Sequence, residues 1–127
     1  MNKYGARKTV FDGIVFDSAK ECRRYQELVI LEHAGKIRDL KLQVPFELIP
    51  AVYERSNEIY TSGKKKGQCK KGKCIERAVK YIVDFVYFDE ETMRWIAEDV
   101  KGVRTQAYII KRKLFRYKYY EYDFREV

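Results

Sequence analysis

The sequence has few of the residues that build disulfide frameworks or zinc sites. Its 127 residues include three cysteines and one histidine. Such a small and odd number of cysteines argues against a disulfide framework. Cys69 and Cys74 have the spacing C-x₄-C, but the other available ligands, Cys22 and His33, fall in a predicted helix. We therefore do not expect a zinc site.

Long apolar runs are missing as well. No stretch is long enough to cross a membrane, and the first residues, Met1-Asn-Lys-Tyr, lack the pattern of a secretory signal peptide. These absences predict a cytoplasmic protein without a membrane partner. The chain should fold, because 46% of its residues are hydrophobic and 15% are aromatic. Its length of 127 residues favours a single domain over residues 1–127.

Proline is rare, and Pro45 is informative because it interrupts a clear strand pattern. Apolar and polar residues alternate over residues 40–49, which predicts a half-buried strand whose inner face holds Leu42, Val44, Phe46 and Leu48. Proline has no N–H group to donate to a ladder. The strand is therefore predicted to lie at the edge of a sheet or to contain a bulge.

Positive charge, by contrast, is in excess. The net charge is +8, which favours a polyanionic partner and most often nucleic acid. Residues 61–76 concentrate this charge and are rich in glycine, so we predict a flexible basic loop there. Its lysines are Lys64, Lys65, Lys66, Lys70, Lys71 and Lys73.

The remaining patterns predict helices packed on a sheet. Residues 8–16 are typical of a hairpin whose turn, Asp12-Gly13, supplies the positive φ angles of a tight turn. A helix over residues 18–34 begins with a capping box of Ser18 and Glu21 and ends before Gly35. It is predicted to bury Cys22, Tyr25, Leu28 and Val29.

Three further strands and a second helix complete the prediction. The strands cover residues 81–88, 95–102 and 120–124, and the helix covers residues 105–119. This helix is predicted to bury Ala107, Ile110, Leu114 and Tyr117. The order predicts an α/β fold in which a central mixed β-sheet is flanked by two main helices.

The two central strands contain acids that an interior strand should avoid. Residues 81–88 (YIVDFVYF) and 95–102 (WIAEDVKG) are rich in β-branched and aromatic residues, yet they include Asp84 and Asp99. A buried carboxylate is costly unless something pairs with it. Asp99 and Lys101 share one strand face, and a hairpin through residues 89–92 can bring Asp84 beside Asp99. The pattern suggests a divalent-metal site with a lysine beside it. The structural alternative is an ordinary ion pair.

This order of elements and acids resembles the PD-(D/E)XK nuclease superfamily. Within it, the chain is similar to a small phage- and prophage-encoded group of endonuclease-like proteins whose activity is uncharacterised. The likeness covers residues 16–21, 43–46, 81–84 and 98–102. Val83 stands where the superfamily's name has proline, and the second acid belongs to a D-x-K pattern. The resemblance implies a restriction-endonuclease-like core.

The resemblance also implies roles for single residues. Asp84 and Asp99 would be the two acids of the motif, Lys101 its lysine, and Glu21 the glutamate that several members contribute from the first helix. Oxygen ligands suit Mg²⁺ or Mn²⁺, which is the expected cofactor. The expected ligands are Asp84, Asp99, Glu21 and the backbone carbonyl of Val100. Lys101 is expected to orient the attacking water or to neutralise the phosphate. Glu21 has an alternative role in the capping box.

The implied function is that of a metal-dependent endodeoxyribonuclease, which hydrolyses phosphodiester bonds with water. DNA is the expected partner, contacted by the basic loop, by Arg24 and by Lys111, although Lys111 could equally belong to a solvated face. Small phage members often process branched or replicating DNA in the host cytoplasm, so a structure-selective or junction-resolving activity is one form of this function. Cutting two strands together would need a homodimer. The alternative is a non-catalytic nucleic-acid-binding module with a structural cluster of acids and lysine.

Overall fold

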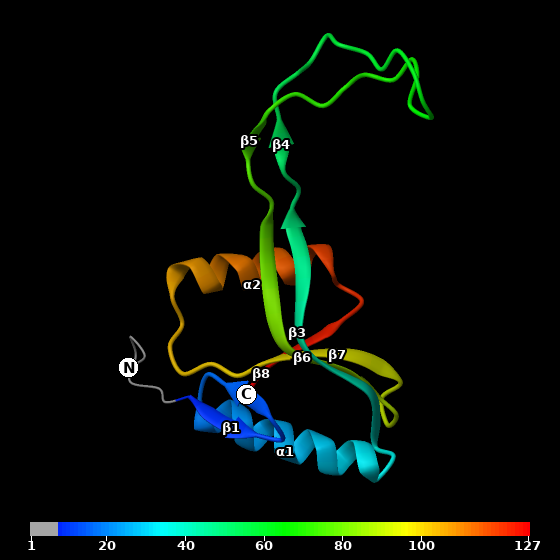
Figure 1. Ribbon diagram of the computed structural model, residues 1–127. Coiled ribbons are helices and arrows are strands. Elements are labelled where there is room, and N and C mark those ends of the chain that lie inside the picture. The colour runs from blue at the N-terminus through cyan, green and yellow to red at the C-terminus, as the bar shows by residue number, and fades with distance from the viewer. Residues whose placement is uncertain (1–7) are drawn as a thin grey trace. The chain divides into compact units, whose positions relative to one another are not determined.

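The computed structural model describes residues 8–127, and the chain divides into two compact units. One unit comprises the chain up to Phe46 together with Tyr81–Val127, and the other is Glu47–Lys80. Neither of the helices in the described part is long and apolar enough to cross a membrane. The elements follow in the order β1 Thr9–Phe11, β2 Ile14–Phe16, α1 Ala19–His33, β3 Ile37–Ile49, β4 Val52–Tyr53, β5 Cys74–Glu76, β6 Val79–Asp89, β7 Arg94–Asp99, α2 Gln106–Lys118 and β8 Asp123–Glu126 (Figure 1).

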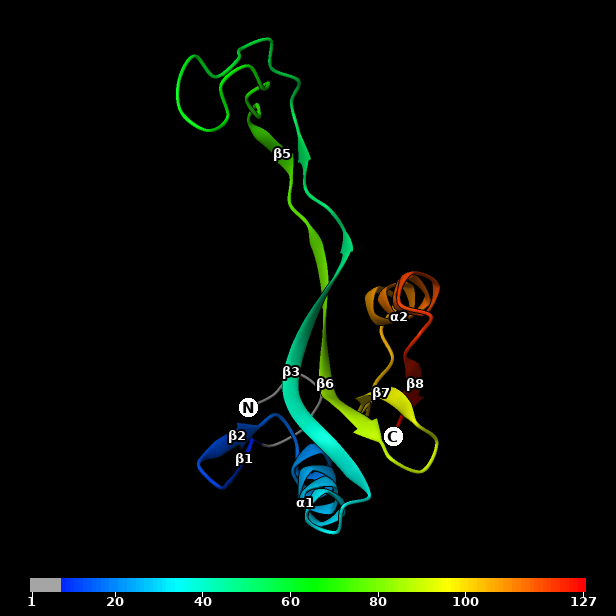
Figure 2. The same cartoon turned by 90° about the vertical axis from the view of Figure 1, so that its right-hand side faces the viewer.

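The main sheet has the strand order β3-β6-β7-β8. β6 and β7 form an antiparallel hairpin, whereas β7 and β8 run parallel and are joined through α2. A parallel pair requires such a crossover, because a short turn cannot return the chain to the same end of the sheet. In Figure 2, β7 and β8 lie between α1 and α2. The predicted α/β fold with a mixed sheet and two helices is confirmed.

The first hairpin and α1 follow their local signals. Asp12 and Gly13 adopt φ angles of +53° and +72°, as the predicted turn requires. Ser18 Oγ accepts a hydrogen bond from the Glu21 backbone N–H at 3.1 Å. Gly35 has a φ of +74°, which an L-residue adopts with strain, and ends the helix. The predicted inner stripe is confirmed, since Cys22 and Leu28 are buried and Tyr25 and Val29 are half-buried.

The strand that contains Pro45 lies at the edge of the main sheet, as predicted. It begins earlier than expected, at Ile37. Its alternation is confirmed, because Leu42 and Val44 are half-buried and Phe46 and Leu48 are buried, while Pro45 is exposed. From this edge position, β3 presents the Gln43 side chain to the neighbouring strand β6.

The buried face of α2 differs from the predicted one. Ile110 and Tyr117 are 56% and 85% exposed, while Tyr108 and Phe115 are buried. The Phe115 ring lies 4.9 Å from that of Phe46, measured between centroids. Both stripes have helical spacing, so the sequence could not separate them. The aromatic stripe is the one that packs, because its rings bury more apolar area against the sheet.

The last strand is also displaced from its predicted position. β8 is Asp123–Glu126 rather than residues 120–124, and Tyr120 is 82% exposed. A turn with a hydrogen bond from Tyr122 N to Tyr119 O follows α2. These residues are needed to reverse the chain before it can pair in parallel with β7, where Phe124 lies opposite Ala97.

The unit Glu47–Lys80 is a two-stranded ribbon. β4 and β5 pair antiparallel, and an isolated bridge joins Ile59 to Cys69. Backbone hydrogen bonds continue the pairing, for example from Lys70 N to Glu58 O at 2.8 Å. The predicted loop over residues 61–76 is therefore too long, because residues 68–76 pair with the preceding segment. The lysines misled the prediction, since exposed side chains of like charge are compatible with a paired backbone.

Candidate active site

The acids of the central strands lie where the β6–β7 ladder ends. Regular pairing stops at Phe85 opposite Glu98. At the next position, Asp99 Oδ1 accepts a hydrogen bond from Asp84 N at 3.2 Å, and Asp84 Oδ2 accepts one from Val100 N at 2.9 Å. The side chains thus replace the backbone ladder. The hairpin therefore brings Asp84 beside Asp99, as the sequence suggested.

Asp99 is fully buried, and both of its oxygens have partners. In addition to the bond from Asp84 N, its Oδ2 accepts a hydrogen bond from the Tyr81 hydroxyl and lies 3.1 Å from Lys101 Nζ. The Lys101 ammonium also lies 4.6 Å from the centroid of the Tyr108 ring, a favourable position for a cation. Asp99 therefore fixes a lysine whose side chain remains 28% exposed.

Glu21 reaches the same place from the first turn of α1. Its side chain is buried, and its Oε1 accepts a hydrogen bond from Gln43 Nε2 at 3.1 Å. The same nitrogen donates to Asp84 Oδ1, also at 3.1 Å. One oxygen of Glu21 and one oxygen of Asp84 thus accept hydrogen bonds from the same nitrogen atom. Through this side chain, β3 links the acid of α1 to the acid of β6.

Negative charge is poorly compensated around Asp84 and Glu21. Burial, together with the charge of Asp99, raises the pKa of Asp84 to about 8. Burial and then the charge of Asp17 raise the pKa of Glu21 above its ordinary value. The nearby ammonium of Lys101 already pairs with Asp99. A cation placed between Glu21 and Asp84 would lower both pKa values, because it stabilises the ionised carboxylates.

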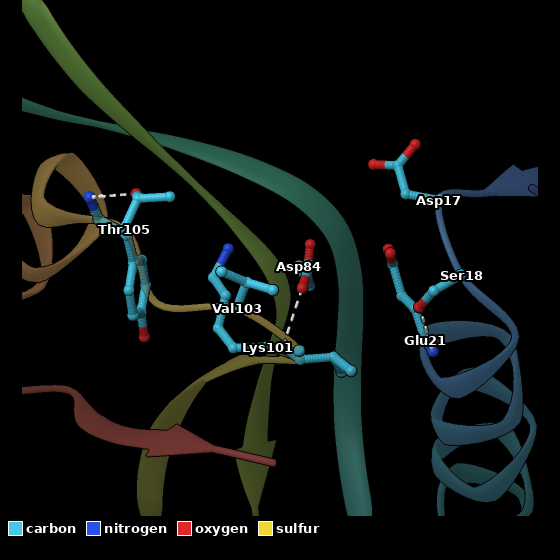
Figure 3. Close-up of a pocket in the computed structure, with 10 residues that line it drawn as sticks. Asp17, Ser18, Glu21, Asp84, Lys101, Val103 and Thr105 are labelled. Carbon is cyan, nitrogen blue, oxygen red and sulfur yellow. Dashed lines mark hydrogen bonds between the residues drawn. The ribbon is translucent and has the colours of Figure 1, made fainter. Parts of the chain in front are cut away.

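These side chains line a pocket of about 340 Å³. Figure 3 shows Asp17 and Glu21 at the start of α1, Asp84 on β6, and Lys101 and Thr105 on the segment between β7 and α2. The described residues of the lining include three carboxylates and one ammonium. The pocket therefore favours a cation and places one positive group where an anion bound beside that cation would lie.

The carboxylates of the site are arranged to offer a magnesium-like ion two protein ligands rather than three. Within residues 8–127, no three Asp, Glu, His or Cys side chains form a group that could hold a metal. Asp99 is engaged by Tyr81 and Lys101, so Glu21 and Asp84 are the acids whose oxygens meet. Mg²⁺ typically takes about one or two protein carboxylates and keeps several waters. Val100, whose carbonyl was expected to be a ligand, lines the pocket.

Arg24, which the sequence analysis expected to contact DNA, is engaged by two glutamates within the protein. Its Nε and Nη2 donate to the Glu98 carboxylate at 2.6 and 2.9 Å, and its Nη1 donates to Glu27. Glu98 is fully buried and also accepts a hydrogen bond from the Tyr87 hydroxyl at 2.8 Å. Arg24 anchors α1 to β7, and its guanidinium is committed to that carboxylate.

The other basic residues expected to contact DNA lie in two places. The six lysines of residues 61–76, in the ribbon unit, are exposed, and Lys111 is half-buried on α2. Lys71 Nζ lies 4.8 Å from the centroid of the Tyr53 ring, and Lys65 and Lys70 lie near Tyr60. Cations interleaved with aromatic rings are typical of nucleic-acid-binding surfaces.

Comparison with known proteins identifies the family of this chain. Residues 1–126 match a protein family described as "Protein of unknown function (DUF1064)". The chain belongs to this family. No curated protein and no solved structure matches it. The chemistry of the family member described here must therefore be inferred from its pocket.

Three residues of the site received no role from the sequence. Gln43 lies in a stretch that the family resemblance covers, and its polar side chain beside Pro45 on an edge strand was the available signal. Tyr81 and Phe85 are four residues apart in β6, so strand alternation places their side chains on the same face. This pattern gave no indication that Tyr81 contacts Asp99. Asp17 precedes the N-cap of α1, where an acid is common for helix capping alone.

Proposed function

We infer that the protein is a metal-dependent endodeoxyribonuclease with a restriction-endonuclease-like PD-(D/E)XK core. It would hydrolyse DNA phosphodiester bonds and use Mg²⁺ or Mn²⁺. The observation that supports this proposal most is the meeting of Glu21, Asp84 and Lys101 in one pocket, with the buried Asp99 holding Lys101 from behind the lining. These residues come from a helix, from two paired strands and from the segment after the second strand.

The charge balance of the pocket favours a functional role over a structural one. A structural buried carboxylate is normally paired and fully hydrogen-bonded, as Glu98 is. Asp84 instead has a pKa raised to about 8 by burial and by Asp99. Such perturbed groups in an open pocket are typical of catalytic and ligand sites. The unbalanced charge is what a divalent cation would neutralise.

In this proposal Asp84 and Glu21 would hold the cation, together with the Val100 carbonyl. The bound cation supplies Lewis-acid stabilisation of the charge that develops on the phosphate. Asp99 fixes the position of Lys101 Nζ, and Lys101 orients the attacking water or neutralises the phosphate. The water oxygen would bond to phosphorus and release a proton to solvent, the bond from phosphorus to the leaving oxygen would break, and that oxygen would take up a proton from solvent. No covalent intermediate with the protein forms.

The ribbon unit supports DNA as the substrate. Its exposed lysines can displace the counterions of a phosphate backbone, which is the main sequence-independent source of affinity for DNA. In the specific form of this proposal the enzyme acts on branched or junction DNA in the cytoplasm of a host cell. Two copies would then form a homodimer to cut two strands.

The decisive experiment is a cleavage panel. Plasmid, linear duplex, single-stranded, flap and four-way junction DNA are incubated with the protein and Mg²⁺ or Mn²⁺, with EDTA as the blank. Asp84→Asn is the test variant. Asp39→Asn is the matched control, because Asp39 is an exposed acid whose φ of +57° asparagine tolerates.

Metal-dependent cleavage of at least one substrate is expected from the wild type and from Asp39→Asn. Asp84→Asn should lose about a thousandfold or more in rate, because removing a ligand of a catalytic metal weakens transition-state stabilisation by several kcal/mol. It should still bind DNA. Binding without cleavage by every protein and with either metal would refute the enzyme proposal and favour the non-catalytic DNA-binding module.

A further inference from the structure

Gln43 is one of two residues of β3 with a positive φ, the other being Asp39. Gln43 lies within β3, yet its φ is +52°. A non-glycine residue with positive φ is uncommon and is strained in a strand. Such strain persists where surrounding contacts determine the conformation, and it is frequent at functional sites. Of these two residues, Gln43 is the one whose side chain reaches the pocket acids Glu21 and Asp84.

The Gln43 amide is placed between two acids of the pocket. A glutamine Nε2 has two hydrogens to donate. One is directed to Glu21 Oε1 and the other to Asp84 Oδ1, each at 3.1 Å. The nitrogen is therefore the point on which two carboxylates from different elements converge. Without a donor at this point, the two like charges would repel each other.

A divalent cation that bridges these oxygens would need the same space. Its distances to oxygen ligands would be about 2.0–2.6 Å, so it would lie close to the present position of Nε2. The amide hydrogens point toward the carboxylate oxygens and carry partial positive charge. The cation and the amide donors therefore exclude each other.

We propose, on the basis of the function inferred above, that Gln43 is a positioning residue that stands in for the metal. Its amide keeps Glu21 and Asp84 converged while no cation is bound, and an entering divalent cation displaces it. The two hydrogen bonds broken on entry oppose metal binding. A shorter side chain that cannot make both bonds should therefore bind the cation more tightly.

The test is a calorimetric titration of the full chain with Mn²⁺, without DNA. Gln43→Asn keeps the amide and tolerates the positive φ, but it lacks the methylene needed to reach both carboxylates. Gln43→Lys places a tethered ammonium at the cation position. Gln68→Asn is the matched control, because Gln68 is an exposed residue of the ribbon unit. Asp84→Asn shows whether Mn²⁺ binds at the pocket.

Gln43→Asn should lower the Kd for Mn²⁺ about three- to tenfold, since one or two weak hydrogen bonds no longer compete. Gln43→Lys should raise the metal-free melting temperature and lose Mn²⁺ binding. Gln68→Asn should match the wild type. A residue with a merely structural role would change the melting temperature and leave the affinity for Mn²⁺ unchanged.

The outcomes separate this inference from the proposed function. If the wild type binds Mn²⁺ in an Asp84-dependent way, unchanged or weaker binding by Gln43→Asn overturns the role of Gln43 alone. If the wild type binds no Mn²⁺, or Asp84→Asn binds it equally well, both proposals fall. Should Gln43→Asn fail to fold, retained Mn²⁺ binding by Gln43→Lys would overturn the inference.

Discussion

Glu98 and Asp99 are consecutive acids, and both are fully buried, yet their surroundings differ. Glu98 faces α1, where Arg24 pairs with it through two nitrogens and Tyr87 adds a third hydrogen bond. The partners of Asp99 are instead Tyr81, the backbone N–H of Asp84, and Lys101, which lines the pocket. Glu98 is thus neutralised by an ion pair with Arg24, whereas Asp99 lies beside further carboxylates.

The difference shows how a buried acid can be recognised as structural or functional. The Glu98 pair balances its charge within the protein, so nothing further needs to bind. Near Asp99, the pKa of Asp84 and that of Glu21 are each raised, first by burial and then by a neighbouring acid. We expect these acids to reduce the stability of the metal-free protein, which is the usual cost of a prearranged site. The predictions below test this contrast, ordered by their expected effect on folding stability.

The largest effect on stability is expected from removing the ion pair between Arg24 and Glu98. Arg24→Ala leaves Glu98 as an unpaired buried charge, which should lower the free energy of unfolding by about 3–5 kcal/mol. Urea titration followed by circular dichroism measures this change. Arg23→Ala is the control, because Arg23 is exposed on the same helix. A loss similar to that of the control would show that the Arg24–Glu98 pair does not hold α1 to the sheet.

Replacing Asp84, an acid of the pocket, should instead raise the free energy of unfolding. Asp84→Asn removes a carboxylate whose ionised form is disfavoured by burial and by Asp99. We expect the metal-free variant to gain about 2 kcal/mol in unfolding free energy, although its cleavage activity is lost. The same urea titration in EDTA measures the gain. Destabilisation by this substitution would mean that Asp84 is a structural acid like Glu98.

The gain from Asp84→Asn should depend on pH. Burial, followed by the charge of Asp99, raises the pKa of folded Asp84 from 3.8 to about 8, so the folded protein binds more protons than the unfolded chain in this range. Its contribution to metal-free stability therefore falls as pH rises. The difference between variant and wild type should grow from about pH 5 to about pH 8. A constant difference across this range would contradict the raised pKa.

The two tyrosines offer a matched pair of smaller changes. Tyr87→Phe and Tyr81→Phe each remove one hydroxyl donor, to Glu98 and to Asp99 respectively. Each should cost about 1–2 kcal/mol in unfolding free energy, since each bond goes to a charged acceptor. Only Tyr81→Phe should also change the rate of metal-dependent cleavage, measured in single turnovers. Equal effects of both substitutions on that rate would remove the functional distinction between the two acids.

The smallest effect on stability is expected from the ribbon unit. Replacing Lys64, Lys65, Lys66, Lys70, Lys71 and Lys73 by serine should leave the unfolding free energy and single-turnover cleavage at saturating protein nearly unchanged, because all six side chains are exposed. DNA binding should weaken, and the log–log salt slope should flatten by about 0.9 for each phosphate of duplex DNA that a lysine no longer neutralises. Unchanged affinity and slope would assign DNA binding to the helices instead.

Local patterns in the sequence determined much of this protein. The turn at Asp12-Gly13, the N-cap at Ser18 and the edge position of the strand with Pro45 each depend on the conformational limits of one or two residues. The meeting of Asp84 with Asp99 also followed from sequence, because a short hairpin has few possible registers. These features lie within one element or between two adjacent strands.

Only the tertiary structure decided which contacts form between distant elements. Two apolar stripes of α2 had equal spacing, and the sheet selected the one with Phe115. Arg24 looked like any exposed helical cation until β7 placed Glu98 against it. Tyr81 contacts Asp99 where β6 no longer pairs with β7, and Gln43 joins Glu21 to Asp84 from a position of β3 with a positive φ. Contacts between side chains of distant elements depend on strand twist and packing, which the periodicity of apolar residues in the sequence does not specify.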